Sequence, residues 1–170
     1  MPRTLNPTTD KLERMRVRRY EEADRPALLA LAPRLAEGVA PWRPAEMVLS
    51  AVTGWVVEAL ERVAEAGRFV LVAEADGTVV GFASGEERRH WSGDPELYVG
   101  ELAVDPQYEG RGVGRALIDG VTEHAKQRGL TTITLDTGAA NRDARGFYQH
   151  IGFEEEDVKL TKRVDGMIGG

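Results

Sequence analysis

The pattern of apolar and polar positions along the chain predicts alternating strands and helices. Val17 alternates with charged neighbours over residues 16–20, which predicts a short strand followed by a helix that begins near Asp24. From Pro44 to Ala66, apolar residues recur at spacings of three and four. This spacing predicts one long amphipathic helix, whose apolar stripe is Val48, Val52, Trp55, Val56, Ala59, Leu60 and Val63.

A β-hairpin is predicted at Asp76-Gly77, which joins two apolar runs over residues 69–75 and 78–84. Asp-Gly between two β-rich runs is the strongest short signal for such a hairpin. A third strand is predicted over residues 97–104. It ends at Asp105-Pro106, because proline cannot donate a hydrogen bond to a β-ladder.

The second half of the chain predicts a helix, a strand, a short helix and a last strand. The first helix spans residues 113–128, and Gly129 follows it as a C-cap. Its apolar stripe is Val113, Leu117, Ile118, Val121 and Ala125. A strand rich in β-branched residues is predicted over residues 131–137. Asn141 caps the next helix, and residues 155–164 are predicted to return as the last strand.

This order of elements predicts an α/β (α+β) fold in one domain. Three consecutive antiparallel strands followed by a βαβ unit imply a mixed, mostly antiparallel sheet of about six strands, with helices on both faces. We expect the domain to span residues 16–164, with a flexible tail at residues 1–15 and a frayed end at residues 165–170.

Composition and charge narrow the function classes. The 170 residues are 42% hydrophobic and 29% charged and include no cysteine, which fits a soluble domain in a reducing cytoplasm and excludes a disulfide framework or a thiolate metal site. The formal charge is −6. Residues 1–20 carry +4, so the remaining 150 carry −10. We therefore expect no membrane span and no nucleic-acid partner, and a preference for cationic small molecules.

Three glycines before the helix at residues 113–128 predict an anion site. Gly110, Gly112 and Gly114 leave the first-turn N–H groups uncovered at the positive end of the helix dipole. Arg111 and Arg115 add positive charge from either side. The spacing departs from the dinucleotide fingerprint, and a Walker loop would need a lysine followed by a hydroxyl residue.

Two motifs flanking these glycines resemble those of the GNAT family of N-acetyltransferases. The family's cofactor motif, Q/R-x-x-G-x-G/A after L-x-V-x-P-x-Y, is similar to residues 102–114, and N-x-x-A-x-x-F/L-Y-x-x-x-G-F matches residues 141–153. The resemblance extends from about Arg16 to Val164, since the order of elements is also the family's. One departure is Glu109, an acid where the family has a cation or an amide near the pyrophosphate.

The resemblance implies that acetyl-CoA lies where the strands at 97–104 and 131–137 splay apart, and that no metal is needed. Backbone groups of the cleft would bind the pantetheine arm, and the glycine turn would bind the pyrophosphate. The cofactor-binding residues it implies are Leu102, Ala103, Val104, Gly110, Arg111, Gly112, Val113, Gly114, Arg115, Asn141 and Tyr148. Asn141 is otherwise explained as a simple N-cap.

Two residues are candidates for proton transfer. Glu101 is the candidate general base, because a carboxylate that shares a strand face with Leu97, Val99 and Ala103 should have a raised pKa. The alternative is a solvated carboxylate at a strand edge. The resemblance implies that Tyr148 protonates the departing thiolate, whereas core packing is the alternative for an aromatic residue at helical spacing.

The acceptor is predicted to be a primary amine that is cationic in solution, since lysine-type amines have a pKa of about 10.4. Trp42, Trp55 and the pair His90-Trp91 are candidates for lining its pocket, although Trp55 could equally fill the core. Two alternatives to an acetyltransferase stay open: a catalytically silent acyl-CoA-binding module and a nicotinamide-dependent oxidoreductase. The resemblance also allows a homodimer, which no sequence feature establishes.

Overall fold

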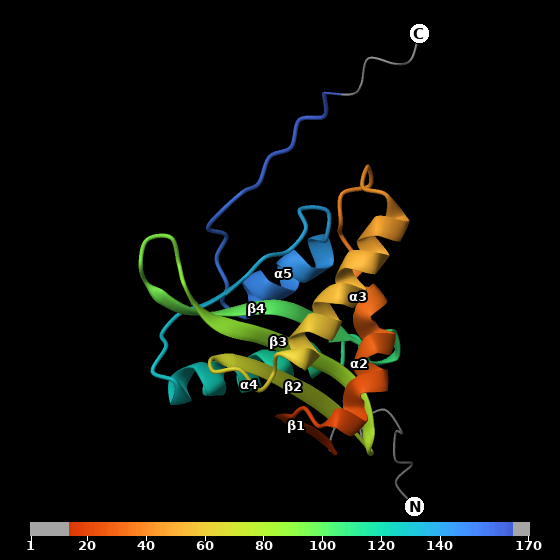
Figure 1. The fold of residues 1–170 in the computed structure, drawn as a ribbon, viewed down its shortest axis with the longest axis vertical. Coiled ribbons are helices and arrows are strands. Elements are labelled where there is room, and N and C mark those ends of the chain that lie inside the picture. Colours follow the sequence, from red (N-terminus) through yellow and green to blue (C-terminus); the bar gives the residue numbers. More distant parts are fainter. Residues whose placement is uncertain (1–13, 165–170) are drawn as a thin grey trace, which may run out of the picture.

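The computed structural model describes residues 14–164, in which helices cover both faces of a five-stranded sheet (Figure 1). The strands are β1 (Met15–Arg19), β2 (Arg68–Ala75), β3 (Thr78–Arg89), β4 (Pro95–Val104) and β5 (Ile133–Leu135). The helices are α2 (Arg25–Leu31), α3 (Ala45–Glu61), α4 (Val113–Gln127) and α5 (Arg142–His150), with the 3₁₀ turns η1 (Glu22–Asp24), η2 (Ala32–Ala36) and η3 (Pro106–Tyr108).

The sheet has the order β1-β2-β3-β4-β5, so each strand lies beside its neighbour in sequence. The first four strands pair antiparallel, and β5 joins β4 in parallel after the crossover through α4. Asp76 and Gly77 adopt φ angles of 50° and 76°, as a two-residue hairpin turn requires. The mixed α/β fold predicted from the sequence is confirmed.

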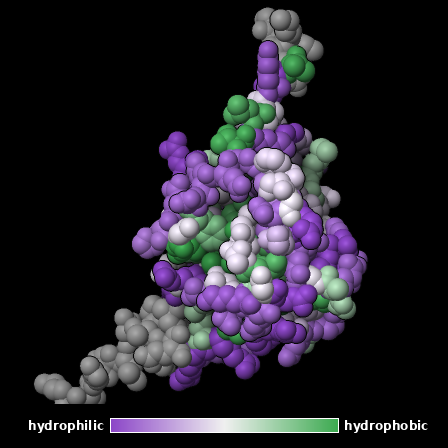
Figure 2. Space-filling model, turned by 90° about the vertical axis from the view of Figure 1, so that its left-hand side faces the viewer, coloured by the Kyte–Doolittle hydropathy of each residue, from purple (hydrophilic) through white to green (hydrophobic). Residues whose placement is uncertain are grey.

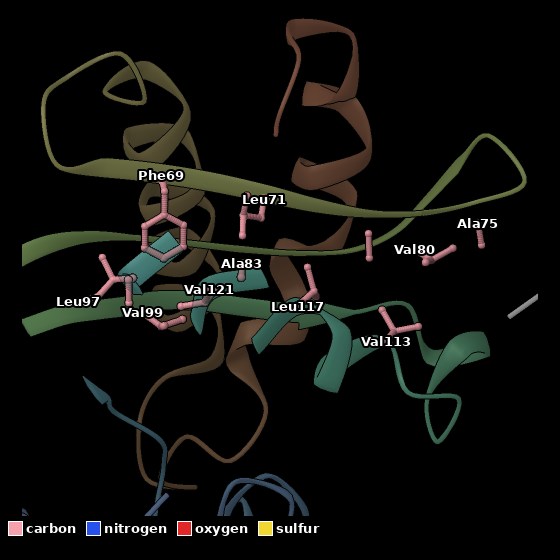
Figure 3. Packing of buried hydrophobic residues seen from close by; sticks show 12 residues of the cluster. Phe69, Leu71, Ala75, Val80, Ala83, Leu97, Val99, Val113, Leu117 and Val121 are labelled. Carbon is pink, nitrogen blue, oxygen red and sulfur yellow. The ribbon is translucent and has the colours of Figure 1, made fainter. Parts of the chain in front are cut away.

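Each face of the sheet has its own apolar core. On one face α4 packs its stripe of Val113, Leu117 and Val121 against residues of β2, β3 and β4, as Figure 3 shows around Phe69, Leu97 and Val99. On the other face, buried residues of α2, η2 and α3 pack against a second set of residues from β2, β3 and β4. The helical residues are Leu28, Leu31, Ala32, Val56 and Leu60, and the strand residues are Val70, Val72, Phe82 and Ala103.

The prediction of a last strand at residues 155–164 is wrong. Residues 153–163 form neither strand nor helix, and the sheet therefore has five strands rather than about six. Val158, Leu160 and Val164 are 77%, 89% and 86% exposed. The alternation of the segment is strand-like, but no edge of its own sheet pairs with it.

The remaining differences concern the ends of elements. β5 pairs over three residues instead of seven, and β3 continues to Arg89, five residues beyond its predicted end at Ser84. The tail predicted at residues 1–15 lies outside the described residues except for Arg14 and Met15, and the end predicted to fray at 165–170 lies wholly outside them. Within residues 14–164, no helix is long and apolar enough to cross a membrane.

Candidate active site

A β-bulge in β4 divides the strand into two parts that face different layers. The ladder with β3 pairs Gly85 with Val99 but Ser84 with Glu101, so that Gly100 is the extra residue. A bulge interrupts the alternation of side chains and re-aims those beyond it. Leu97 and Val99 accordingly belong to the core beside α4.

Beyond the bulge, Ala103 belongs instead to the core beside α2 and α3. Glu101, which pairs with Ser84 and lines a cavity with residues of α3, lies on this same face. The sequence-based prediction that Glu101 shares a face with Leu97 and Val99 is therefore wrong, because it assumed uninterrupted alternation.

Gly85 makes the close approach at the bulge possible. A Cβ atom at this position would lie 1.9 Å from the carbonyl oxygen of Tyr98 and 2.9 Å from the ring of Phe69. Any side chain there would therefore displace β4 from β3 just where the strand changes its facing.

Glu101 lies in a cavity of about 180 Å³ between β4 and α3. The hydroxyl of Ser84 donates a hydrogen bond to Glu101 Oε2 at 2.6 Å. The cavity is lined by Trp55, Glu58, Ala59, Arg62, Arg68, Phe69, Gly85, Glu86, Tyr98, Gly100 and Glu101. Glu101 is therefore a half-buried carboxylate with a single hydrogen-bond donor, and not a solvated residue at the strand edge.

Burial raises the pKa of Glu101 above its ordinary value, since desolvation disfavours the charged form. The hydrogen bond from Ser84 opposes this effect, as does the charge of Arg68, whereas the carboxylates of Glu58 and Glu86 add to it. A carboxyl group with a raised pKa is a better proton acceptor than a solvated one.

The two arginines of this cavity are already paired with carboxylates. Arg62 Nη1 lies 2.7 Å from Glu58 Oε1, and Arg68 Nη2 lies 2.9 Å from Glu86 Oε2. Glu101 has no such ion pair in the part of the chain that the structure describes. The cavity thus contains one carboxylate whose charge no neighbouring guanidinium contacts.

Tyr98 is a residue of this cavity that the sequence analysis did not single out. Its hydroxyl donates to Asp136 Oδ2 at 3.0 Å, and the guanidinium carbon of Arg88 lies 3.6 Å from its ring centre. Burial, with the hydrogen bond to Asp136, raises its pKa to about 12. Tyr98 and Asp136 come from β4 and from the residue after β5, so no local motif could have indicated the contact.

On its other edge, β4 separates from β5. The parallel ladder ends at the pair Val99–Leu135, and within residues 14–164 no strand pairs with residues 100–104 on this side. The splayed strands of the predicted cleft are thereby confirmed. The N–H of Asp105 donates to the carbonyl oxygen of Val80, so the backbone groups of Asp105 point to β3. Because the direction of backbone groups alternates along a strand, those of Ala103 also point to β3, whereas those of Leu102 and Val104 point to the cleft.

The glycine turn leads into α4 with its backbone uncovered. Gly110 and Gly112 have φ angles of 70° and 84°, and a Cβ atom at either position would meet no atom within 4 Å. The side chain of Val113 is buried, so only its backbone N–H is offered at the helix start. Gly114 has a different role, because its missing Cβ makes room for the ring of Phe147.

Two arginines, Arg111 and Arg115, flank the start of α4. Neither Arg111 nor Arg115 forms an ion pair within the described residues, and Arg111 lies over the ring of Tyr108 at 5.5 Å. The positive charge of the turn is therefore not neutralised by a neighbouring carboxylate.

Arg34 compensates the acid that departs from the family motif. Its guanidinium contacts the carboxylates of both Glu109 and Glu37, and its Nε donates to the carbonyl oxygen of Val104 at 3.2 Å. Arg34 lies in η2, 75 residues before Glu109, so the local motif gives no sign of it. One of the two cleft-facing residues of β4 is thus also tied to η2.

On α5, Tyr148 lies between two other aromatic rings. Burial raises its pKa to about 12, and its ring packs against those of Phe147 and Phe153 with centroid distances of 5.2 and 5.4 Å. Its hydroxyl has no hydrogen-bond partner within residues 14–164. Asn141 is the N-cap of α5, since its Oδ1 accepts from the N–H of Ala144 at 3.2 Å.

The predicted site residues fall into two groups. The cavity around Glu101 includes Trp55, which is 50% exposed and does not fill the core, but not Trp42, Trp91 or Tyr148. The cleft side contains the glycine turn, and α5 is linked to that turn through the contact of Phe147 with Gly114. Within the described chain, no three His, Cys, Asp or Glu residues are grouped as metal ligands.

Comparison with known proteins identifies the family. The model of the acetyltransferase (GNAT) family matches residues 30–153. The chain belongs to this family. Among solved structures, the PaiA N-acetyltransferase of Thermoplasma acidophilum in complex with coenzyme A has a TM-score of 0.72 at 20% identity, covering 85% of this chain and 92% of that one.

Two further proteins to which the chain is similar are also named N-acetyltransferases. An aminoglycoside N-acetyltransferase in complex with CoA has a TM-score of 0.66 at 23% identity, covering 88% of this chain and 93% of its own. An uncharacterised N-acetyltransferase of Methanocaldococcus jannaschii is 35% identical over 119 residues, which are 65% of this chain and 51% of that protein. The chain thus spans about half the length of this curated relative.

Proposed function

We propose that the protein is an N-acetyltransferase that moves an acetyl group from acetyl-CoA directly to a primary amine of a small molecule or a peptide. The observation that carries the proposal is the bulge at Gly100. It places a carboxylate with a raised pKa on one side of β4 while the opposite edge of the strand opens toward β5. The cosubstrate and the amine can therefore meet at one strand.

The residues of the cleft fit coenzyme A. Uncovered N–H groups at the start of α4, the unpaired charges of Arg111 and Arg115, and the space around Gly110 and Gly112 suit a pyrophosphate. The backbone groups of Leu102 and the N–H of Val104 are directed to the place proposed for the pantetheine arm, whereas the carbonyl oxygen of Val104 already accepts from Arg34. When bound, acetyl-CoA supplies the activated acyl group, and the chain itself needs no nucleophilic cysteine.

Glu101 would accept the proton that the amine must lose. A lysine-type ammonium has a pKa of about 10.4, so at neutral pH it cannot attack before deprotonation. Glu101 is the carboxylate of the cavity that no arginine neutralises, and it would therefore attract the ammonium group as well as take its proton. This favours a cationic acceptor such as a polyamine, an aminoglycoside or a basic peptide.

Tyr148 would donate a proton to the sulfur of the departing coenzyme. Its raised pKa keeps the hydroxyl protonated over the working range, and that hydroxyl has no competing partner in the described chain. Asn141 would bind the pantetheine arm through the second hydrogen of Nδ2, because its first is donated to the carbonyl oxygen of Glu37 at 3.4 Å and Oδ1 forms the N-cap.

Little supports the alternatives. Glu109 was the one sign of a module that binds acyl-CoA without turnover, and its contact with Arg34 accounts for that charge. A nicotinamide-dependent oxidoreductase has no support from the family to which the chain belongs. A cytoplasmic location and the absence of a nucleic-acid partner stay predictions.

Free thiol released from acetyl-CoA, followed with a panel of primary amines, tests the proposal. We expect release that depends on the amine and is greatest with polycationic acceptors. Because the chain contains no cysteine, thiol reagents detect only the product. Calorimetric binding of coenzyme A without release by any amine would favour the silent module, and absence of binding would refute the assignment of the cleft.

A further inference from the structure

A second cavity, of about 450 Å³, lies where β2 extends past the end of β1. The ladder between the two strands ends at the pair Arg19–Leu71, and the N–H of Tyr20 then donates to the carbonyl oxygen of Val70 at 3.0 Å. Because β2 already begins at Arg68, its start has no strand beside it on this side within residues 14–164. The ends of β1 and α4 and the start of β2 form the walls of the cavity.

The floor of this cavity is apolar. Phe69, Val70 and Leu71 line it, and all three are buried residues of the sheet. Figure 2 shows the side of the molecule on which β2 begins and α4 ends, and hydrophobic side chains there lie in a hollow ringed by hydrophilic ones. A concave apolar floor with a few polar groups, in a volume of roughly 300–1,000 Å³, is typical of small-molecule sites.

Positive charge predominates in the walls. Arg19, Arg68 and Arg128 line the cavity, against the single carboxylate of Glu87. Arg128 contacts Glu87, and Arg68 is paired with Glu86, which is not a lining residue. Arg19 forms no ion pair with any residue that the structure describes. The cavity therefore offers an unneutralised guanidinium, although the protein as a whole carries a formal charge of −6.

His124 adds a polar group without a hydrogen-bond partner. Its ring centre lies 5.2 Å from that of Phe69, and its Nε2 atom is buried with no partner among the described residues. Burial lowers the pKa of His124, as do the charges of Arg19 and Arg128, whereas Glu87 opposes them. A bound anion would offset these effects and favour the protonated ring.

We propose that this cavity is a second ligand site, which takes a small organic anion with an apolar body, and that its occupancy acts on the acceptor site through Arg68. The apolar body would pack on Phe69 and Leu71, and the anionic group would contact Arg19. The site is separate from the glycine turn, none of whose residues line this cavity. The coupling to the acceptor site rests on the proposed function, whereas the binding itself does not.

Arg68 connects the two cavities. Arg68 and Phe69 line both the anion cavity and the cavity around Glu101. Arg68 Nη2 lies 2.9 Å from Glu86 Oε2, and its positive charge opposes the rise in the pKa of Glu101. An anion in the second cavity gives the guanidinium another partner. The charge that acts on Glu101 is then smaller, so its pKa should rise further when the ligand binds.

Titration of the full chain with benzoate, without coenzyme, tests the binding. Calorimetry should detect benzoate at millimolar concentration and benzamide, its uncharged counterpart, about tenfold more weakly, because only the anion makes a charge-assisted contact. In NMR spectra, benzoate should shift the amides of residues 67–71 and move the titration of the His124 ring to higher pH. Equal binding of the two probes, shifts confined to residues 110–115, or no binding would overturn the anion site.

Two substitutions of exposed side chains locate the charge that recognises the anion. Gln127→Glu introduces a carboxylate of nearly the same size into the wall and should weaken benzoate binding about tenfold. Arg19→Gln should weaken it several-fold. The matched control, Arg16→Gln, removes the same charge from the same strand, where Arg16 binds Glu74 outside the cavity, and should leave the affinity unchanged. Wild-type affinity in both Gln127→Glu and Arg19→Gln contradicts the proposal.

Thiol release at varied pH tests the coupling. With saturating benzoate, the loss of wild-type activity at acid pH should begin at a higher pH, and Gln127→Glu at the same benzoate concentration should show a smaller change. Benzoate that binds but leaves this pH dependence unchanged would overturn the coupling. Absence of thiol release with every amine would refute the proposed function and the coupling together, whereas the calorimetric and NMR results on the anion site would stand.

Discussion

The two sides of β4 present different kinds of chemical group. The cleft side uses backbone groups of consecutive residues, the glycine turn and the start of α4, whereas the cavity on the other side uses side chains from α3, β2, β3 and β4. The groups on the cleft side come from one short stretch of the sequence. The groups of the cavity depend on contacts between residues that are far apart in the sequence.

Removal of the Glu101 carboxylate should have the largest effect. Glu101→Gln should lower kcat/KM at neutral pH by roughly 10²–10⁴-fold, the usual contribution of a general base. The pKa of Glu101 is raised, so wild-type activity should fall as the pH drops through that raised pKa and the carboxylate becomes protonated. The variant should lack this dependence and recover in part at high pH, where the amine deprotonates unaided.

Glu58→Gln is the control for charge, because it alters a carboxylate of the same cavity that is paired with Arg62. It should change the KM for a cationic amine more than kcat. A pH profile of Glu101→Gln that matches the wild type would remove Glu101 from the mechanism.

Loss of the Tyr148 hydroxyl should reduce turnover less. Tyr148→Phe keeps the ring that packs against Phe147 and Phe153, and we expect kcat to fall roughly 10²-fold with little change in the KM for acetyl-CoA. Tyr98→Phe is the matched control on the other side of β4 and should retain more of kcat. Full turnover of Tyr148→Phe across the pH range would exclude the proton-donor role.

A side chain in the glycine turn should weaken the coenzyme site alone. Gly112→Ala forces a left-handed conformation on a residue with φ of 84°, at a cost of about 1–2 kcal/mol, and should raise the KM for acetyl-CoA about tenfold. Gly146→Ala, inside α5 with no atom within 4 Å of the new Cβ, should leave the KM unchanged and stabilise the helix by roughly 1 kcal/mol. Equal KM values for the two variants would contradict a backbone anion site.

The smallest expected effect concerns the pair Arg34 and Glu109. Arg34→Ala leaves the Glu109 carboxylate uncompensated beside the turn and should raise the Kd for coenzyme A several-fold, because partly exposed pairs contribute about 1 kcal/mol or less. Adding Glu109→Gln should restore affinity, and the double-mutant cycle in calorimetry measures the coupling. Additive effects would mean that Glu109 points away from the phosphate region.

Elements with a strong local signal could be predicted from the sequence. The turn at Asp76-Gly77 and the stripe of Val113, Leu117 and Val121 have conformations that neighbouring residues determine, and both were predicted correctly. The candidate coenzyme turn belongs to the same class, since its glycines and the following helix are consecutive.

Features that depend on distant partners could not be predicted. Gly100 gives no sign that it is a bulge, because this depends on Gly85 accepting the close approach of Tyr98 O. The contact of Arg34 with Glu109 joins residues 75 positions apart. Residues 155–164 alternate like a strand but form none, because a pattern of side chains cannot specify whether an edge of the sheet accepts the segment.

The unpaired glycine of β4 lets odd-numbered side chains of one strand reach both layers of helices. Before Gly100 the odd-numbered side chains of β4 pack toward α4. After it, the odd-numbered Glu101 faces the cavity beside α3, on the other side of the sheet. If Gly100 instead paired as an ordinary residue of the ladder, uninterrupted alternation would turn Glu101 toward α4 and Leu102 toward α3. Deleting Gly100 would by contrast keep Glu101 opposite Ser84 on the same face. The unpaired state of this glycine, and not the length of β4, therefore decides which side chain reaches the α3 layer.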